Sequence, residues 1–483
     1  MKFRLISRIL GIGLIGFSFF QLLPILVSYI YQEPNVGGFV SSFAITFAVG
    51  LFFYLVNYER DYSGIRVREG FILTVSLWIF FTVFGTTPFL LSSNNEISLV
   101  SAYFESTSGL TTTGATIYSN LANEFRSLLF YRGLLQWIGG LGIIVLAIAL
   151  MPLLGVGGMQ LYRGEMQGPV NQSKLRPKIA ETAKVLLYVY LILTLLCLFS
   201  YFFAGMSYFD AIIHSFTTVA IGGFSNYDQS FAFFDNDLIY LIACVFMFIS
   251  GISFSLHYLS FSNFKILNYL RDPEFNFYTK LLLASVLFFI LTLWIVGFGD
   301  EENIPIIALF QVVSFATTTG FTITDQSSLP LYLPQLLILL GMLGACAGST
   351  AGGFKSIRGL ILIQHAKREL KKLVHPNIVL PLKLGKKRIS NEVADSVWGF
   401  LIVYVLTLIV GIIILMGSGL EAETAISSVA SSLNNLGPGL GEVSNNYSIM
   451  NDFQKIVLSL IMILGRLEIY TLLVLFTSYF WRE

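Results

Sequence analysis

The tetrapeptide "TTTG" occurs at residues 111–114 and again at residues 317–320, each time directly after an apolar stretch. Two related turns follow similar stretches, "TTVAIGGFS" at 217–225 and "SLNNLGPGL" at 432–440. One such turn alone is explained by a capped helix end. Four turns at matching places in a repeating pattern instead indicate one structural unit that is used four times.

The composition predicts a membrane protein. Hydrophobic residues make up 55% of the 483 residues and charged residues only 12%, and the mean hydropathy is +0.76, far above that of a soluble domain. A run of about 20 apolar residues is long enough to cross a bilayer as a helix. Such runs lie at 7–30, 37–57, 70–92, 128–152, 183–204, 236–260, 279–298, 333–362, 397–416 and 453–479. We therefore predict an all-α polytopic membrane protein.

The charged residues predict its orientation. Basic residues gather in alternate connections, which the positive-inside rule places in the cytoplasm together with both chain termini. The basic set comprises Arg60, Arg66, Arg68, Arg163, Lys174, Arg176, Lys178, Lys265, Arg271 and the segment 355–388. The remaining connections are mostly acidic, so the exterior would attract cations unless these residues are only a solvated loop surface. The N-terminal run is too long for a secretory signal and lacks a cleavage site, which predicts a retained first helix.

From residue 70 onward the chain repeats one pattern: a long apolar span, a shorter apolar stretch, a glycine-containing turn and a second long span. The short stretches at 98–110, 208–218, 303–316 and 421–433 are too short to cross a bilayer, which predicts half-crossing helices that return through non-helical backbone. The predicted organisation is two N-terminal transmembrane helices in 1–69, followed by repeats at 70–182, 183–275, 276–389 and 390–483.

Units that enter and leave on one side share an orientation, so they can surround a central pore with pseudo-fourfold symmetry. Aligning the turns on one glycine gives Gly114, Gly222, Gly320 and Gly437. Rings of backbone carbonyls can replace the water shell of a cation, and glycine permits the positive φ that such turns need. The partially negative C-terminal ends of the half-helices would favour a cation as well.

The turns, the helix–half-helix–helix units and the two additional N-terminal helices resemble the superfamily of Trk, Ktr and HKT potassium transporters, in particular the TrkH type of bacteria. The resemblance covers the whole chain and implies potassium uptake across the bacterial inner membrane, driven by the membrane potential. It also implies that one glycine of each repeat lines a single filter where potassium, the substrate, binds. The implied filter comprises Thr111, Thr112, Thr113, Gly114, Val219, Ala220, Ile221, Gly222, Thr317, Thr318, Thr319, Gly320, Asn434, Asn435, Leu436 and Gly437.

The four turns are not identical, and none contains the TVGYG signature of tetrameric potassium channels. We therefore expect potassium to be preferred over sodium less absolutely than in those channels. The fourth turn, "NNLGPGLG", departs most from the others and predicts an asymmetric wall.

The stretch "GACAGSTAGGFKS" at 344–356 interrupts what would otherwise be a continuous span. Glycine costs about 1 kcal/mol in a helix interior, which favours an unwound segment beneath the filter; close helix packing through small residues is the alternative. The resemblance implies a loop that blocks the cytoplasmic side of the pore and is held shut by Arg466, whose alternative role is a structural ion pair with Glu468. The implied gate comprises Gly344, Ala345, Cys346, Ala347, Gly348, Ser349, Thr350, Ala351, Gly352, Gly353 and Arg466.

Other candidate sites are weak. The cysteines and histidines show no metal-ligand spacing and no disulfide framework; they are Cys197, Cys244, Cys346, His214, His257, His365 and His375. "GIGLIG" at 11–16 lies inside a transmembrane run and indicates packing, and "GPGLGE" at 437–442 lacks the ending of a phosphate-binding loop. We expect no nucleotide site and no enzyme activity. Arg132 and Gln136 are expected to be buried polar contacts, without an assigned role.

The basic clusters "HAKRELKKL" at 365–373 and "KLGKKR" at 383–388 are in the first place positive-inside anchors. The resemblance further implies a homodimer in the lipid membrane and a cytosolic, TrkA-like nucleotide-binding regulatory subunit that docks on 155–180, 262–275 and 365–390. It implies no nucleic-acid partner. The alternative function is a symporter that couples potassium to protons or sodium, for which Arg466 and Glu468 are the clear ionisable candidates. A membrane enzyme would need converging Asp, Glu, His or Cys residues in the core, and these are nearly absent.

Overall fold

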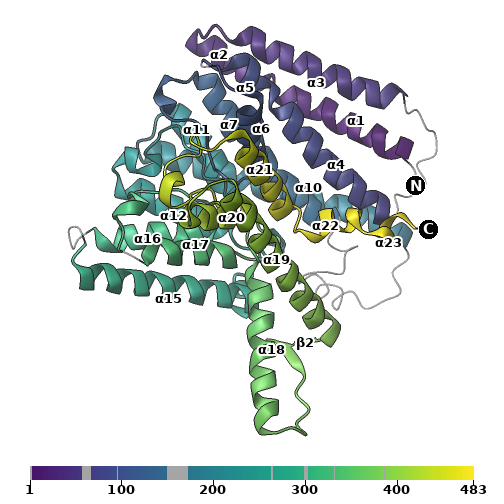
Figure 1. The fold of residues 1–483 in the computed structure, drawn as a ribbon, viewed down its shortest axis with the longest axis vertical. Coiled ribbons are helices and arrows are strands. Elements are labelled where there is room, and N and C mark those ends of the chain that lie inside the picture. The colour runs from purple at the N-terminus through teal and green to yellow at the C-terminus, as the bar shows by residue number, and fades with distance from the viewer. Residues whose placement is uncertain are drawn as a thin grey trace.

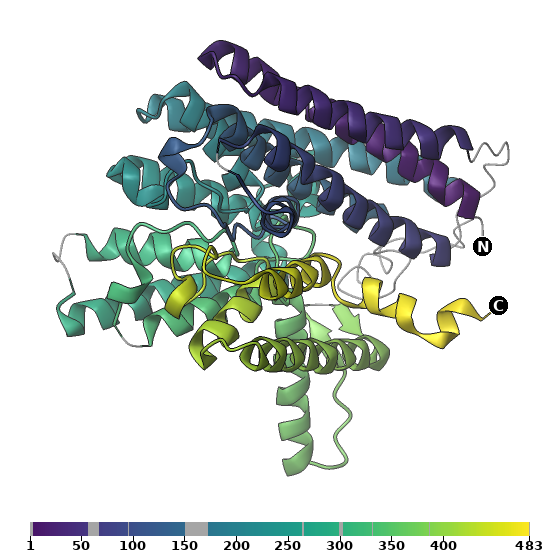
Figure 2. The same ribbon diagram turned by 45° about the horizontal axis from the view of Figure 1, so that its top comes forward.

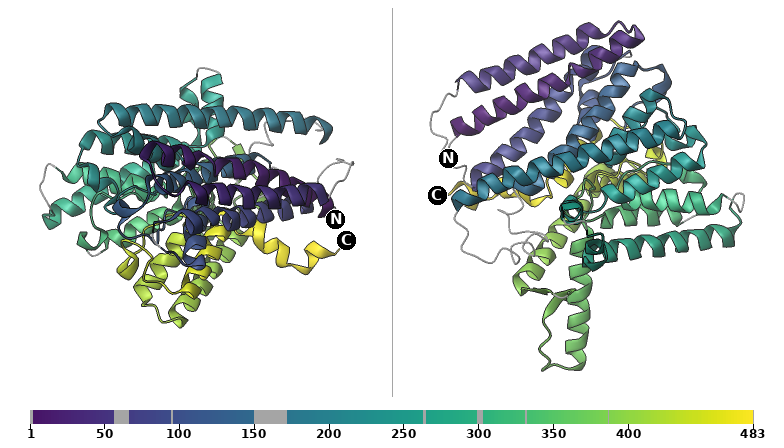
Figure 3. Two further views of the ribbon diagram at one scale, coloured as in Figure 1. Left: turned by 90° about the horizontal axis from the view of Figure 1, so that it is seen from above. Right: turned by 180° about the vertical axis from the view of Figure 1, so that it is seen from behind.

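The computed structural model describes residues 3–56, 67–94, 96–149, 172–262, 265–298, 303–330, 332–385 and 387–482. The described chain is a bundle of long helices around shorter central ones (Figures 1 and 2), and the two ends of the chain lie close together on one side of the bundle (Figure 3). The predicted all-α membrane architecture is confirmed.

The N-terminal segment forms α1 (Phe3–Phe20), α2 (Leu23–Tyr31) and α3 (Val36–Val56). Helix α1 packs along α3 (Figure 1). A Cβ atom on Gly11 would lie 2.6 Å from the Gly50 carbonyl oxygen, so the two backbones approach as closely as glycine permits. The glycine pattern at 11–16 therefore includes a helix-packing contact.

The helices of the four repeats follow in chain order. The first contains α4 (Val67–Gly85), α5 (Thr87–Ser92), α6 (Leu99–Leu110) and α7 (Arg126–Ala149), and the second α10 (Gln172–Phe203), α11 (Tyr208–Val219), α12 (Asp237–Ser250) and α13 (Phe254–Ser262). The third contains α15 (Pro273–Val296), α16 (Ile304–Ala316), α17 (Leu333–Leu343) and α18 (Ser356–Val374), preceded by α14 (Leu267–Arg271). The fourth contains α19 (Asn391–Gly417), α20 (Ala422–Asn434) and α21 (Asp452–Arg466), with α22 (Tyr470–Leu473) and α23 (Ser478–Trp481) after it. Single 3₁₀ turns lie at Leu121–Asn123, Ser230–Phe234, Gln326–Ser328, Gly441–Val443 and Val474–Phe476.

The half-crossing helices α6, α11, α16 and α20 begin and end within one residue of the predicted short stretches. Side-chain caps fix two of their starts: Ser98 accepts a hydrogen bond from the Ser101 amide, and Ser207 from the Asp210 amide. The sequence therefore determined these four helices well.

Seven helices of the described chain are long and apolar enough to cross a membrane, or up to nine if two bent pairs count as spans. The pair α12–α13 bends by 90°, and the pair that begins with α21 bends by 103°. The expected run at 333–362 is not one helix, because α17 ends at Leu343 and α18 begins only at Ser356. The glycine-rich stretch between them is unwound, as its composition predicted.

Helix α18 projects away from the bundle, nearly across the direction of the long helices (Figure 1). An antiparallel pair of short strands follows it, β1 (Leu382–Leu384) and β2 (Lys387–Ile389), with Lys383 opposite Arg388. The basic cluster at 365–390 therefore lies mainly on one protruding element.

Candidate functional site

The four half-helices end in the same hydrogen-bonded turn. In each turn one backbone amide donates to the carbonyl oxygen five residues earlier, at 2.8–2.9 Å. These bonds join Thr113 to Ser108, Gly222 to Thr217, Thr319 to Ser314 and Leu436 to Ser431. The hydrogen bonds give a structural alignment of the turns that does not depend on sequence similarity.

Each turn also contains two residues with positive φ, spaced two apart. The pairs are Thr112 (53°) and Gly114 (84°), Ile221 (54°) and Gly223 (82°), Thr318 (65°) and Gly320 (80°), and Asn435 (52°) and Gly437 (101°). The second residue of each pair is always glycine, which adopts a positive φ without steric cost.

This alignment corrects the second turn by one residue. Gly223, not Gly222, occupies the position of Gly114, while Gly222 corresponds to Thr113 and Val219 to Leu110, the last residue of α6. The other three predicted glycines occupy equivalent positions. The sequence held a signal for the right choice, because "GFS" after Gly222 matches "GFT" at 320–322 once the second glycine is used.

The four turns form a closed ring. A Cβ atom on the glycine of each turn would collide with a carbonyl oxygen of the next turn. The colliding pairs are Gly114 with Gly222, Gly223 with Thr319, Gly320 with Leu436, and Gly437 with Thr113. Four carbonyl oxygens at equivalent positions therefore lie around one centre, and the C-terminal ends of four helices lead into it.

A cavity of about 490 Å³ lies on one side of the ring, and all four glycines, Gly114, Gly223, Gly320 and Gly437, line it. Its wall includes the carboxylates of Asp228 and Asp325. Burial and the nearby Asp210 carboxylate raise the pKa of Tyr227, another lining residue, so its hydroxyl stays neutral. A cation reaching the ring from this side meets neutral or acidic groups along most of the wall.

Arg132 also lines this cavity, but its charge is paired. Its Nε lies 2.8 Å from Glu105 Oε1, and the two side chains are 2% and 0% exposed. The guanidinium also donates to the Ser225 carbonyl and to the Thr116 hydroxyl, at 3.0 Å each. This buried pair joins the segments that follow the first and second turns, so breaking it would leave a costly uncompensated charge.

The unwound segment 344–355, called the plug loop below, lies on the other side of the ring. The Thr350 hydroxyl donates to the Val219 carbonyl (3.1 Å), the Gly352 amide to the Thr318 hydroxyl (2.8 Å) and the Gly353 amide to the Asn434 carbonyl (3.1 Å). The loop thus contacts the ends of α11, α16 and α20 directly. Every residue predicted for the gate in 344–353 belongs to it.

The plug loop is also bonded to the elbow, defined as residues 251–262 and 265–272, which contain α13 and α14. The Cys346 amide donates to the Gly251 carbonyl, and the Phe254 amide to the Gly348 carbonyl, at 3.0 Å each. Just beyond the elbow, in the first turn of α15, Glu274 Oε1 accepts from the amides of Ala347 (2.7 Å) and of Ile357 on α18 (3.2 Å). Hydrogen bonds from the start of the elbow and from the first turn of α15 therefore hold the plug loop, an arrangement that nothing in the sequence indicated.

Comparison with known proteins identifies the family to which the chain is similar. The family of cation transport proteins called TrkH matches residues 38–482. The Trk system potassium uptake protein TrkH of Salmonella typhimurium is 46% identical, and that of Escherichia coli K12 45% identical, each over the full length of both chains. The crystal structure of the potassium transporter TrkH from Vibrio parahaemolyticus superposes with a TM-score of 0.93 at 43% identity, covering all of both chains.

The chain belongs to the TrkH family. The four helix–half-helix–helix repeats and the two leading helices are the TrkH fold. The part of the predicted partner surface at 155–171 lies outside the described residues. The predicted surface at 262–275 includes α14, and that at 365–390 includes the end of α18 and the strand pair.

In this TrkH-family chain, Arg466 connects the plug loop to the first repeat. Its Nη1 donates to the Thr350 carbonyl and its Nη2 to the Gly139 carbonyl, at 3.0 Å each, and the residue is 2% exposed. The alternative ion pair with Glu468 is not formed, because Glu468 pairs with Arg358 at 2.5 Å instead. Arg466 thus links the plug loop to α7 of the first repeat, in addition to the loop's own bonds to the ends of α11, α16 and α20.

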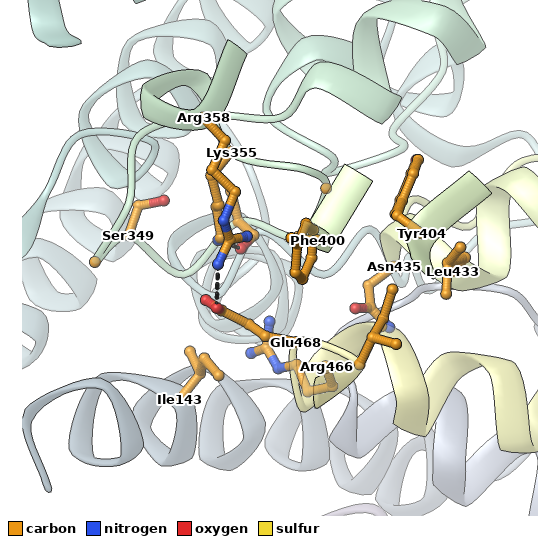
Figure 4. A pocket seen from close by; sticks show the side chains of 16 residues that line it. Ile143, Ser349, Lys355, Arg358, Phe400, Tyr404, Leu433, Asn435, Arg466 and Glu468 are labelled. Carbon is orange, nitrogen blue, oxygen red and sulfur yellow. Dashed lines mark hydrogen bonds and ion pairs between the residues drawn. The ribbon is translucent and has the colours of Figure 1, made fainter. Parts of the chain in front are cut away.

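Only about 20 Å³ of space remains beneath the ring (Figure 4), roughly the room for one water molecule. Three cationic side chains line it, Lys355, Arg358 and Arg466, against the single carboxylate of Glu468. Lys355 donates to the Ala351 carbonyl of the loop, and the Arg358 guanidinium lies 4.0 Å from the centre of the Phe400 ring. Lack of space and excess positive charge both oppose a cation here.

Proposed function

We propose that this chain takes up potassium through a channel-like pore whose filter is the ring of four turns. The observation that carries the proposal is the closed contact of Gly114, Gly223, Gly320 and Gly437 with the carbonyls of neighbouring turns. Two similar proteins are named as potassium uptake proteins, which supports potassium as the transported ion.

The filter would work by exchanging water for backbone oxygens. The carbonyls of Thr113, Gly222, Thr319 and Leu436 form one layer, and carbonyls of the adjoining filter residues would supply further layers. Two buried side-chain oxygens in these turns, Thr112 Oγ1 and Asn435 Oδ1, have no hydrogen-bond partner among the described residues and would be available to the ion.

The plug loop and Arg466 would be the gate. Opening requires the loop to leave its bonds to the ends of three half-helices and to Arg466. Uptake would then follow the membrane potential, which is worth about 2.3 kcal/mol per charge per 100 mV.

A cytosolic TrkA-like nucleotide-binding subunit would control this gate by docking on α14, on α18 with its strand pair, and on 155–180. The elbow supports this route, since it is hydrogen-bonded to the plug loop and carries exposed apolar side chains at Ile266, Leu267 and Leu270. The chain would work as a homodimer in the bacterial inner membrane with both termini in the cytoplasm. Basic residues on α18, Lys367, Arg368, Lys371 and Lys372, fit that orientation.

The test is potassium and sodium flux into liposomes that contain the chain alone, under an imposed potential and without any other ion gradient. We expect potassium-selective flux that follows the potential, and more sodium through Gly114→Ser, which forces a side chain against the Gly222 carbonyl. Potassium that moves only with a proton or sodium gradient would favour the symporter instead. Unchanged selectivity in Gly114→Ser would reject the filter.

A further inference from the structure

Gln136 on α7 is fully buried beside the second filter turn. Its Nε2 donates to the Gly222 carbonyl at 2.6 Å, and its Oε1 accepts from the Phe224 amide at 3.1 Å. The two bonds bracket Gly223, the glycine of the second wall. Among the hydrogen bonds of the described chain, no other filter glycine is bracketed by one side chain.

Each turn forms one wall of the ring, and the first and third walls are stabilised by hydrogen bonds between side chains of the same turn. The hydroxyls of Thr111 and Thr113 lie 2.8 Å apart, and those of Thr317 and Thr319 are also 2.8 Å apart. The fourth wall has its own brace, because Asn435 Nδ2 donates to the Thr113 hydroxyl and to the Met462 carbonyl, at 3.0 Å each.

The second wall has no comparable side chains. Ala220 and Gly222 stand at the positions of the threonine pair, so no hydroxyl is present at either place. A Cβ atom on Gly222 would collide with the amide group of Gln136. The Gln136 side chain therefore occupies the space where a side chain of residue 222 would lie. Its hydrogen bonds stabilise the second turn in place of those that threonine hydroxyls make in the first and third turns.

We propose that Gln136 is a positioning residue of the filter, which fixes the direction of the Gly222 carbonyl from the neighbouring helix. The inference rests on the proposed function, since the direction of one carbonyl matters only if that carbonyl faces a dehydrated cation. The donated hydrogen bond also withdraws electron density from the Gly222 oxygen. The second wall would then attract a cation less strongly than the others, so Gln136 would influence the choice between ions more than the rate of passage.

The test compares Gln136→Met with Gln311→Met in the liposome assay, measuring potassium and sodium flux separately. Methionine keeps the length of glutamine but removes both hydrogen bonds. We expect the potassium-to-sodium flux ratio of Gln136→Met to fall about tenfold, as expected for losing one or two buried hydrogen bonds, with potassium flux much less affected. Gln311 is the matched control because it is equally buried and its Nε2 donates to the Thr324 hydroxyl at 2.7 Å, beyond the filter.

A rescue variant separates positioning from mere packing. The triple change Gln136→Ala, Ala220→Thr and Gly222→Thr gives the second turn the threonine spacing of the first and third, and it should restore the flux ratio. A triple variant that transports potassium without regaining the ratio would count against the inference.

Equal loss of both ion fluxes in Gln136→Met, or the same change in ratio in Gln311→Met, would show a structural role only and overturn the inference. A native protein that selects potassium, with Gly114→Ser impaired and Gln136→Met unchanged, would overturn the inference while leaving the proposed function intact. A native protein without potassium selectivity would reject both.

Discussion

The two sides of the filter ring differ in space and in charge. On one side a cavity of about 490 Å³ reaches all four filter glycines. On the other, the plug loop leaves about 20 Å³. Among the described residues that line the wide side, Arg132 is the one arginine, and Glu105 neutralises it. On the narrow side, Lys355, Arg358 and Arg466 share one carboxylate.

In the function proposed above, this difference separates ion selection from closure of the pore. The cavity on the wide side reaches the ring, so a cation would reach the filter while the pathway is shut. Hydrogen bonds of the plug loop and positive charge on the narrow side would maintain the closed state. Changes on the narrow side should therefore alter how much passes, and changes in the ring should alter which ion passes.

Deleting residues 345–353 tests this comparison with the largest expected effect. The residues on either side of the deleted segment lie close together, since the Phe354 amide donates to the Met342 carbonyl at 2.9 Å, so a short connection can rejoin the chain. If the loop keeps the pore shut about 99% of the time, its removal raises potassium flux up to about 100-fold. Liposome flux measures the change, and flux at the native level would show that closure lies elsewhere.

Arg466→Ala should have the next largest effect, about a tenfold rise in flux, because it removes two hydrogen bonds from a charged donor that hold the loop to Gly139. Arg368→Ala is the control, since Arg368 lies on α18 and bonds to Glu369, His365 and Asn391 far from the ring. An equal rise in both variants would mean that positive charge in general, and not this contact, holds the gate.

Gly223→Ala tests whether the contact between neighbouring turns of the ring determines ion selectivity. The new side chain would be strained at a φ of 82° and would collide with the Thr319 carbonyl, which should lower the potassium-to-sodium flux ratio about fivefold. Gly205→Ala imposes a similar backbone strain, at a φ of 106°, where no atom lies within 4 Å of the new Cβ. A loss of selectivity in Gly205→Ala would mean that strain alone, without contact between the turns, explains the effect.

Glu274→Gln should have the smallest effect. Glutamine keeps one oxygen as an acceptor for the amides of Ala347 and Ile357 but replaces the second carboxyl oxygen with an amide group, so this contact would hold the plug loop less firmly. We expect potassium flux to rise about threefold, the effect of weakening one buried hydrogen bond. Glu392→Gln, which also changes an acid in the first turn of a helix, should leave flux unchanged. A fall in flux for Glu274→Gln would contradict the role of Glu274 in holding the plug loop.

Much of this fold could be predicted because its main features are local in sequence. Helix length and the turn motifs placed α6, α11, α16 and α20 within one residue, and the glycine cluster located the plug loop. The second filter glycine was misplaced because two glycines stand together, and only the following phenylalanine distinguishes them. The bend between α12 and α13 was missed because hydropathy continues unbroken through it.

The supporting residues could not be predicted for a different reason. Gln136 lies 86 residues from the Gly222 carbonyl that it binds, and Glu274 lies 73 residues from the Ala347 amide. Neither contact has a spacing or composition that marks it in the chain. Such partners become visible only when the packing brings distant segments together.

The four walls of the ring lie on one chain and are braced by different side chains. In a pore assembled from four copies of one subunit, every substitution changes all the walls at once. Here a single amino-acid substitution changes one of the four turns, and the three unchanged turns serve as an internal reference. Under the proposed function, the ion preference would be adjustable in small, separate steps, and the chain would be a scaffold for engineering graded discrimination among alkali metal ions.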